Sequence, residues 1–156
     1  MQVTLLTVGR LKNGPEKHLI DTYVKRCPWP VSIHEVEEKR PIKGVERMAR
    51  EGDLLQKALK DHGGAAPYII ALDERGKTMR SPDFAKLIEK RQDAGTANLV
   101  FLIGGADGYA PDIKQQAHSL LSLGEMTWPH MMARVLICEQ LYRASCILAG
   151  HPYHKD

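Results

Sequence analysis

Residues 99–109 read LVFLIGGADGY and join a wholly apolar run to a glycine-rich turn. The run from Leu99 to Ile103 has no polar position, so both of its faces need cover, as in a central strand of a parallel sheet. Residues 68–72, YIIAL, form a second run of this kind. Together the two runs predict an α/β fold with a largely parallel sheet and helices on both faces.

Strands and helices alternate along the rest of the chain. We expect further strands at residues 3–8, 31–36 and 120–123, with the strand at 31–36 toward an edge of the sheet. Helices are expected at residues 15–27, 45–62, 111–117 and 129–148, and one more begins with Ser81 as N-cap and Pro82 in its first turn. In helix 45–62 the inward positions are Val45, Met48, Leu55, Ala58 and Leu59. The length of 156 residues fits a single domain, 1–156.

Three segments follow the carboxyl ends of predicted strands: residues 73–79, 104–109 and 124–128. Because ligands of open parallel sheets bind at this edge, these segments are the candidate binding loops. Gly104 and Gly105 allow the backbone to approach a ligand closely, but a tight turn needs the same glycines. Trp128 in the third segment fits either a binding loop or packing. The residues alone leave both interpretations open.

The last helix, residues 129–148, carries apolar side chains nearly all the way round. A helix of this kind is buried on every side, and one small sheet covers only one side of it. We therefore expect the other side to pack on a second copy of the chain. Glu139 and Arg143 lie one turn apart on this helix and can form an ion pair.

Bulk properties set limits on location and partners. No apolar stretch approaches the roughly 20 residues of a membrane span. The first residues, MQVTLLTV, read as a strand and not as a signal peptide, which predicts a cytoplasmic protein with no membrane partner. The net charge of +3 permits an anionic partner without requiring one.

Several common site motifs are excluded. Gly9 and Gly14 resemble the start of a phosphate-binding loop, but Pro15 stands where lysine and serine or threonine are needed. GxGxxG, GxSxG and HExxH do not occur in the sequence. The three cysteines form no CxxC pair and are expected to be buried apolar residues. His151 and His154 have no third ligand nearby, so no metal site is expected.

Four motifs in order carry a family resemblance: LIGGADG at 102–108, MTWPH at 126–130, EQLYRA at 139–144 and HPYH at 151–154. With this combination the chain resembles the ribosomal RNA large subunit methyltransferase H family, of the SPOUT class, over essentially its whole length. The resemblance implies an α/β knot of the trefoil type, with a largely parallel sheet of five or six strands and helices on both faces. In such a knot the carboxyl-terminal half of the chain passes through a loop and forms the cofactor site. It also implies a homodimer.

The resemblance further implies an activity and a site. The family uses S-adenosylmethionine to methylate N3 of a pseudouridine in 23S rRNA of the ribosome. Carried over by motif, the catalytic residues are His154 and Tyr153, which handle the N3 proton or orient the base, and Arg143, which stabilises negative charge on the uracil carbonyls. The cofactor-binding residues are Leu72, Gly104, Leu123, Gly124, Glu125, Met126, Thr127 and Trp128.

Two other functions stay open at this point. The chain could be an RNA- or ribosome-binding module without catalysis, which would not need the cofactor. It could also be a SPOUT methyltransferase that acts on tRNA. The lack of an appended RNA-binding domain favours a substrate whose own shape presents the base, which is the case for a ribosome.

Overall fold

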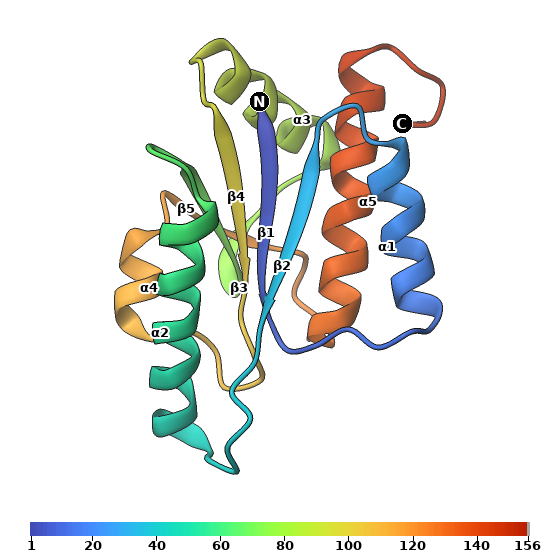
Figure 1. Ribbon diagram of the computed structural model, residues 1–156. Coiled ribbons are helices and arrows are strands. Elements are labelled where there is room, and N and C mark those ends of the chain that lie inside the picture. The colour runs from blue at the N-terminus through green and yellow to red at the C-terminus, as the bar shows by residue number, and fades with distance from the viewer. Residues whose placement is uncertain (156) are drawn as a thin grey trace.

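The computed structural model describes residues 1–155, which form one five-stranded sheet flanked by five helices (Figure 1). The strands are β1 Gln2–Val8, β2 Val31–Val36, β3 Tyr68–Thr78, β4 Asn98–Ile103 and β5 Ser119–Ser122. The helices are α1 Pro15–Arg26, α2 Gly44–His62, α3 Ser81–Asp93, α4 Pro111–Gln116 and α5 His130–Leu148.

All strand pairs are parallel, in the order β2-β1-β4-β3-β5. The predicted α/β class is confirmed, and β2 lies at an edge as expected. The threading of the carboxyl-terminal half through a loop stays a prediction. None of the helices within residues 1–155 combines the length and the apolar character that a membrane span requires.

The sheet is covered on both faces because side chains of β4 alternate between two cores. Leu99, Phe101 and Ile103 belong to a core with α1, α3 and α5. Val100 and Leu102 belong to a second core with α2 and α4. Figure 1 shows the same division, with α2 and α4 on one side of the sheet and α1 and α5 on the other. The wholly apolar run of β4 follows from this double cover.

The structure corrects three local expectations. Ser81 is not an N-cap: it is the first residue of α3, and its hydroxyl donates to Gln140 Oε1 at 2.8 Å. Val45 does not face inward and is 77% exposed, because it lies in the first turn of α2. β3 continues past Leu72 to Thr78 and pairs again with β5 after an irregularity, so most of the predicted loop 73–79 is strand.

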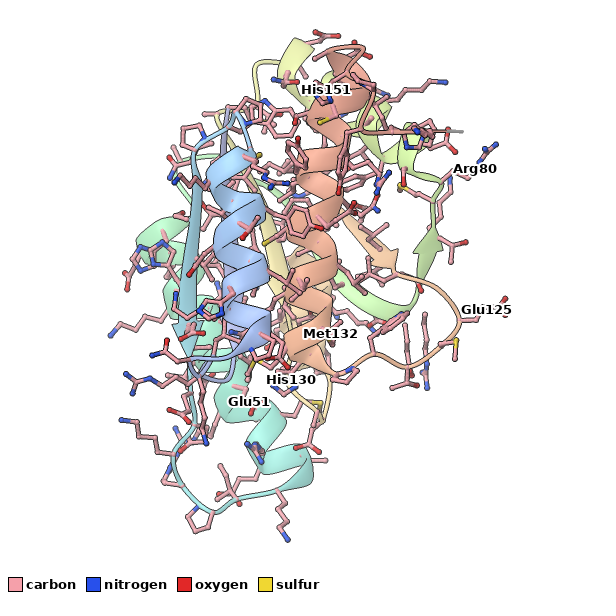
Figure 2. All side chains as sticks on the ribbon, turned by 90° about the vertical axis from the view of Figure 1, so that its right-hand side faces the viewer. Glu51, Arg80, Glu125, His130, Met132 and His151 are labelled. Atoms are coloured by element: carbon pink, nitrogen blue, oxygen red, sulfur yellow. The ribbon has the colours of Figure 1, made fainter. Side chains whose placement is uncertain are left out.

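Helix α5 packs against the sheet between α1 and α3, and Figure 2 shows it alongside α1. Its buried side includes Ile137, Cys138 and Leu141. Met132 and Leu136, one turn apart, remain half-buried. In the single chain, α5 is therefore buried on the side that faces the sheet and where it meets α1 and α3. On its remaining side, Met132 and Leu136 keep apolar surface accessible.

Candidate functional site

A cavity of about 440 Å³ opens at the carboxyl ends of β3, β4 and β5. It is formed by the segments that follow these strands and by the first turn of α5, as expected for a ligand site at this edge of a parallel sheet. The predicted cofactor residues that line it are Leu72, Gly104, Leu123, Gly124, Met126, Thr127 and Trp128. Glu125 does not line it: the residue is exposed, and Figure 2 places it at the outer tip of its loop.

The turn after β4 is held by the phenol of Tyr109. Its hydroxyl donates to the carbonyl of Leu102 at 2.7 Å and accepts from the backbone N–H of Gly104 at 2.9 Å. A Cβ at Gly104 would lie 3.1 Å from the Tyr109 ring. A side chain at residue 104 would thus press on the Tyr109 ring, and Gly104 also lines the cavity, so the two interpretations of this glycine are compatible. Burial raises the pKa of Tyr109, which keeps the phenol protonated as a donor.

An ion pair closes one side of the cavity. Lys114 Nζ lies 2.6 Å from Asp73 Oδ2, and the backbone N–H of Arg75 donates to Asp73 at 2.8 Å. Burial alone would raise the pKa of Asp73, but the Lys114 ammonium and this backbone donor outweigh it, so the pKa lies below its usual value. Asp73 is therefore a charged, paired carboxylate at neutral pH.

The loop after β5 presents apolar side chains to the surface. It begins with a turn in which Ser122 Oγ donates to the carbonyl of Gly124 at 2.8 Å and accepts from its N–H at 3.2 Å. Gly124 has a φ of 124°, which side-chain-bearing residues rarely adopt. Beyond the turn, Met126 is 76% exposed and Trp128 is 42% exposed. Two large apolar side chains thus lie uncovered at the mouth of the cavity in the single chain.

A buried arginine ties the start of α5 to the end of β1. Arg134 is 0% exposed; it donates to Glu35 at 2.7 Å and to the carbonyls of Val8 and Gly9 at 2.8 and 2.6 Å. Burial lowers the pKa of Arg134, and the partner Glu35 opposes that effect. The sequence does not mark Arg134 as a site residue, because it interrupts an otherwise apolar helix without any local motif.

Two further polar residues near this point were also missed. Glu51 of α2 is 3% exposed, and His130, the first residue of α5, lines the cavity. Figure 2 shows both residues near the start of α5, and the charge of Glu51 raises the pKa of His130. A signal existed for Glu51, because it falls between Met48 and Leu55 on the inward stripe of its helix.

The three predicted catalytic residues form one cluster with Glu139 on α5. Tyr153 Oη donates to Glu139 Oε1 at 3.1 Å, and Arg143 donates to the same oxygen at 2.5 and 2.9 Å, which confirms the predicted ion pair. Arg143 Nη1 lies 3.3 Å from His154 Nδ1 and its Cζ lies 4.8 Å from the centre of the Tyr153 ring. Burial, together with hydrogen bonds to Tyr23 and Glu139, raises the pKa of Tyr153, which makes this phenol a donor and not a base near neutral pH.

The structure does not bring this tail cluster to the cavity of the same chain. Its members are absent from the cavity lining, which reaches α5 only at His130 and Ala133. Arg143 lies 13 residues beyond His130, which corresponds to about 20 Å along a helix. Figure 2 shows His130 and His151 at opposite ends of α5.

The chain is similar to known proteins and to solved structures. A family model described as "Predicted SPOUT methyltransferase" matches residues 1–154. Proteins named ribosomal RNA large subunit methyltransferase H are 51% identical in Dinoroseobacter shibae and 46% identical in Paramagnetospirillum magneticum, each over 99% of both chains.

Two solved structures share the fold at low sequence identity. A probable methylase family protein from Haemophilus influenzae has a TM-score of 0.60 and 10% identity, covering 99% of this chain and 70% of that one. A probable methyltransferase from Bordetella pertussis has a TM-score of 0.59 and 14% identity, covering 92% and 95%. Since the family model and the relatives extend over the whole described fold, the chain belongs to the SPOUT methyltransferase family, among the ribosomal RNA large subunit methyltransferase H proteins.

Proposed function

We propose that this chain uses S-adenosylmethionine to methylate N3 of a pseudouridine in 23S rRNA of the ribosome. The observation that carries the proposal is identity of 41–51% over the whole chain to proteins named ribosomal RNA large subunit methyltransferase H. The enzyme would act as a single domain, residues 1–156, in the cytoplasm, with the cofactor site in its carboxyl-terminal half and without a metal.

The cavity fits S-adenosylmethionine in size and in chemistry. Its volume of about 440 Å³ lies within the usual range of small-molecule sites, roughly 300–1,000 Å³. Leu72 and Leu123 provide apolar walls for a nucleoside. The rim carries Glu74, Asp107 and Arg75, and charges of both signs suit the ammonium and carboxylate of an amino-acid group. When bound, the cofactor supplies a methyl group on a positively charged sulfur.

The separation of about 20 Å between tail cluster and cavity supports a homodimer. One chain holds the cofactor cavity and, at the far end of α5, the residues assigned to catalysis. A second copy packed on α5 would cover Met132 and Leu136 and bring its own tail to the first copy's cavity. The exposed Trp128 lies next to this surface, because Trp128 and Leu136 line a second cavity of about 260 Å³.

In this arrangement the tail cluster handles the target base. Tyr153, whose hydroxyl proton is donated to Glu139, orients the uracil face with its ring. Arg143, fixed by Glu139, stabilises negative charge that develops on the carbonyls. Within the tail cluster, His154 is the candidate acceptor of the N3 proton, since an imidazole is a suitable acceptor near neutral pH.

The test uses ribosomes from cells that lack this protein. Incubation with the purified protein and radiolabelled S-adenosylmethionine should add one methyl group to 23S rRNA, located at a pseudouridine by mass spectrometry. Label in tRNA and none in ribosomes would instead support the tRNA alternative. Binding to ribosomes without measurable cofactor affinity would support the module without catalysis and refute the proposal.

A further inference from the structure

Glu51 carries a carboxylate oxygen that lacks a partner in a place closed to water. The residue is 3% exposed, and Oε1 accepts from Arg47 Nε at 3.0 Å. Oε2 is buried and has no hydrogen-bond partner within residues 1–155. A Cβ on Gly105 would lie 2.6 Å from this oxygen, so Oε2 is directed at the turn that lines the cavity. An unpaired buried carboxylate oxygen is costly, so Glu51 is poised to interact with a positive charge that develops nearby.

His130 is the counterpart of Glu51 on the cavity wall. It is half-buried at the first position of α5, and its Nε2 is 3.2 Å from where a Cβ on Gly9 would lie. Burial lowers the pKa of His130, and the charges of Arg134 and Arg47 lower it further, whereas the charge of Glu51 raises it. The imidazole is thus neutral at neutral pH, and a carboxylate stands ready to stabilise its protonated form.

The other titratable groups of the cavity do not suit proton uptake. Asp73 is paired with Lys114, and the hydroxyl of Tyr109 is already used as both donor and acceptor. Glu74 and Asp107 are exposed, and ordinary carboxylates are weak bases at neutral pH. Among the described residues that line the cavity, His130 is the one whose side chain can take a proton near neutral pH.

We propose that His130, supported by Glu51, accepts the N3 proton of the target base within the cavity. This inference rests on the proposed function and gives to His130 the role assigned above to His154. The N3–H bond breaks as an N–H bond forms on the imidazole, and the ring electron pair left on N3 forms the bond to the methyl carbon. The carbon–sulfur bond breaks with its electrons going to sulfur. The imidazolium so formed is stabilised by the negative charge of Glu51.

The first test measures proton binding without any reaction. The ring signals of the 7 histidines can be titrated by NMR, and His130 is assigned by the signal that disappears in His130→Gln. Because the Glu51 charge raises the pKa of His130, Glu51→Gln should move that titration to lower pH. Asp53→Asn, an exposed carboxylate on the same helix, is the matched control and should leave it unchanged. An identical His130 titration in Glu51→Gln would overturn the pairing.

The second test measures methyl transfer in a single turnover on ribosomes that lack the modification. His130→Gln should lower the rate by about 10²-fold or more, with cofactor affinity by calorimetry unchanged. His18→Gln, an exposed histidine of α1, is the control, and His154→Ala is measured in parallel. A wild-type rate in His130→Gln together with loss of rate in His154→Ala would assign the proton to the tail and refute this inference alone.

Two further outcomes remain decisive. If His130→Gln does not fold, the rate of Glu51→Gln is followed against pH: its acid limb moves to lower pH if His130 is the acceptor and coincides with wild type if it is not. If the wild-type protein transfers no methyl group to ribosomes, the proposed function has failed, whatever the histidine titrations show.

Discussion

Removal of a single hydroxyl, in Tyr109→Phe, should weaken both the fold and the cofactor site. The phenol oxygen joins the carbonyl of Leu102 to the N–H of Gly104, so it fixes the turn at the point where β4 ends. Phenylalanine keeps the ring that packs against Gly104 but leaves both backbone groups without this partner.

The size of the effect follows from the two groups left unpaired. A buried polar group without a partner costs about 1–3 kcal/mol, and the turn is only partly buried, so we expect a total near 2 kcal/mol. With a urea dependence of about 2 kcal/mol per molar, the unfolding midpoint should fall by about 1 M. The loosened turn must be ordered again when the cofactor binds. If this ordering costs about 1.4 kcal/mol of the binding free energy, cofactor affinity falls about tenfold.

Urea unfolding and titration calorimetry with S-adenosylmethionine measure the two quantities. Tyr68→Phe is the matched control, because Tyr68 acts through its ring, which lies 4.7 Å from that of His118 and 4.4 Å from Arg91 Cζ. The control should stay close to wild type in both assays. Equal midpoints and equal affinities for Tyr109→Phe and Tyr68→Phe would refute the claim that the hydroxyl fixes the turn.

Four further outcomes are expected. Gly104→Val should abolish most cofactor binding by calorimetry, and unchanged affinity would remove this turn from the site. Deletion of residues 151–156 should keep the fold and cofactor binding but reduce ribosome methylation about 10²–10⁴-fold; full methylation would show an inert tail. The pKa of Asp73 is lowered in the folded protein, so its carboxylate stabilises the fold above about pH 4, and this stabilisation is lost as the pH falls through the lowered pKa. The urea midpoint of Asp73→Asn should therefore lie below that of wild type at about pH 7 and approach it at about pH 3. Leu136→Cys should form an intermolecular disulfide on mild oxidation, and persistent monomers would contradict a dimer on α5.

The central strands of the sheet are predicted well from the sequence because their residues are uninterruptedly apolar. β4 and the first part of β3 contain uninterrupted apolar runs, and such runs are stable only with cover on both faces. The second part of β3 has no such signal. Its polar residues pair through the backbone, with Lys77 opposite Leu121, so the extension depends on where β5 lies. Ser81 shows the same limit, since its hydroxyl is used by Gln140 of a distant helix.

The candidate site is predictable where it depends on backbone and not where it depends on buried charge. The glycines after β4 and the loop after β5 mark the cavity because ligands bind at the ends of parallel strands. Arg134 is buried by contacts with residues far away in the sequence, and no local motif marks it. Glu51 falls on the inward stripe of its helix, but its approach to the turn at Gly105 depends on the fold. The conformation of the tail is likewise hard to predict from the sequence, because Tyr153 and His154 are held by Glu139 and Arg143 of α5.

The position of the two clusters on α5 sets a geometric condition on the proposed dimer. His130 at the cavity and Arg143 in the tail cluster are equally far from a point between residues 136 and 137. In a two-fold symmetric contact each residue i of one copy meets a residue j of the other, and the same pair recurs in reverse. Two α5 helices that cross antiparallel near Leu136 would therefore bring Arg143 of each copy to the His130 end of its partner. Leu136 is apolar and half-buried in the single chain, as an axis position requires. A shift of this axis by one helical turn would move each tail along its partner by about 11 Å, twice the rise per turn, and out of reach of the cavity. Arg134 fixes the start of α5 to β1, so α5 would not slide within its own chain to compensate.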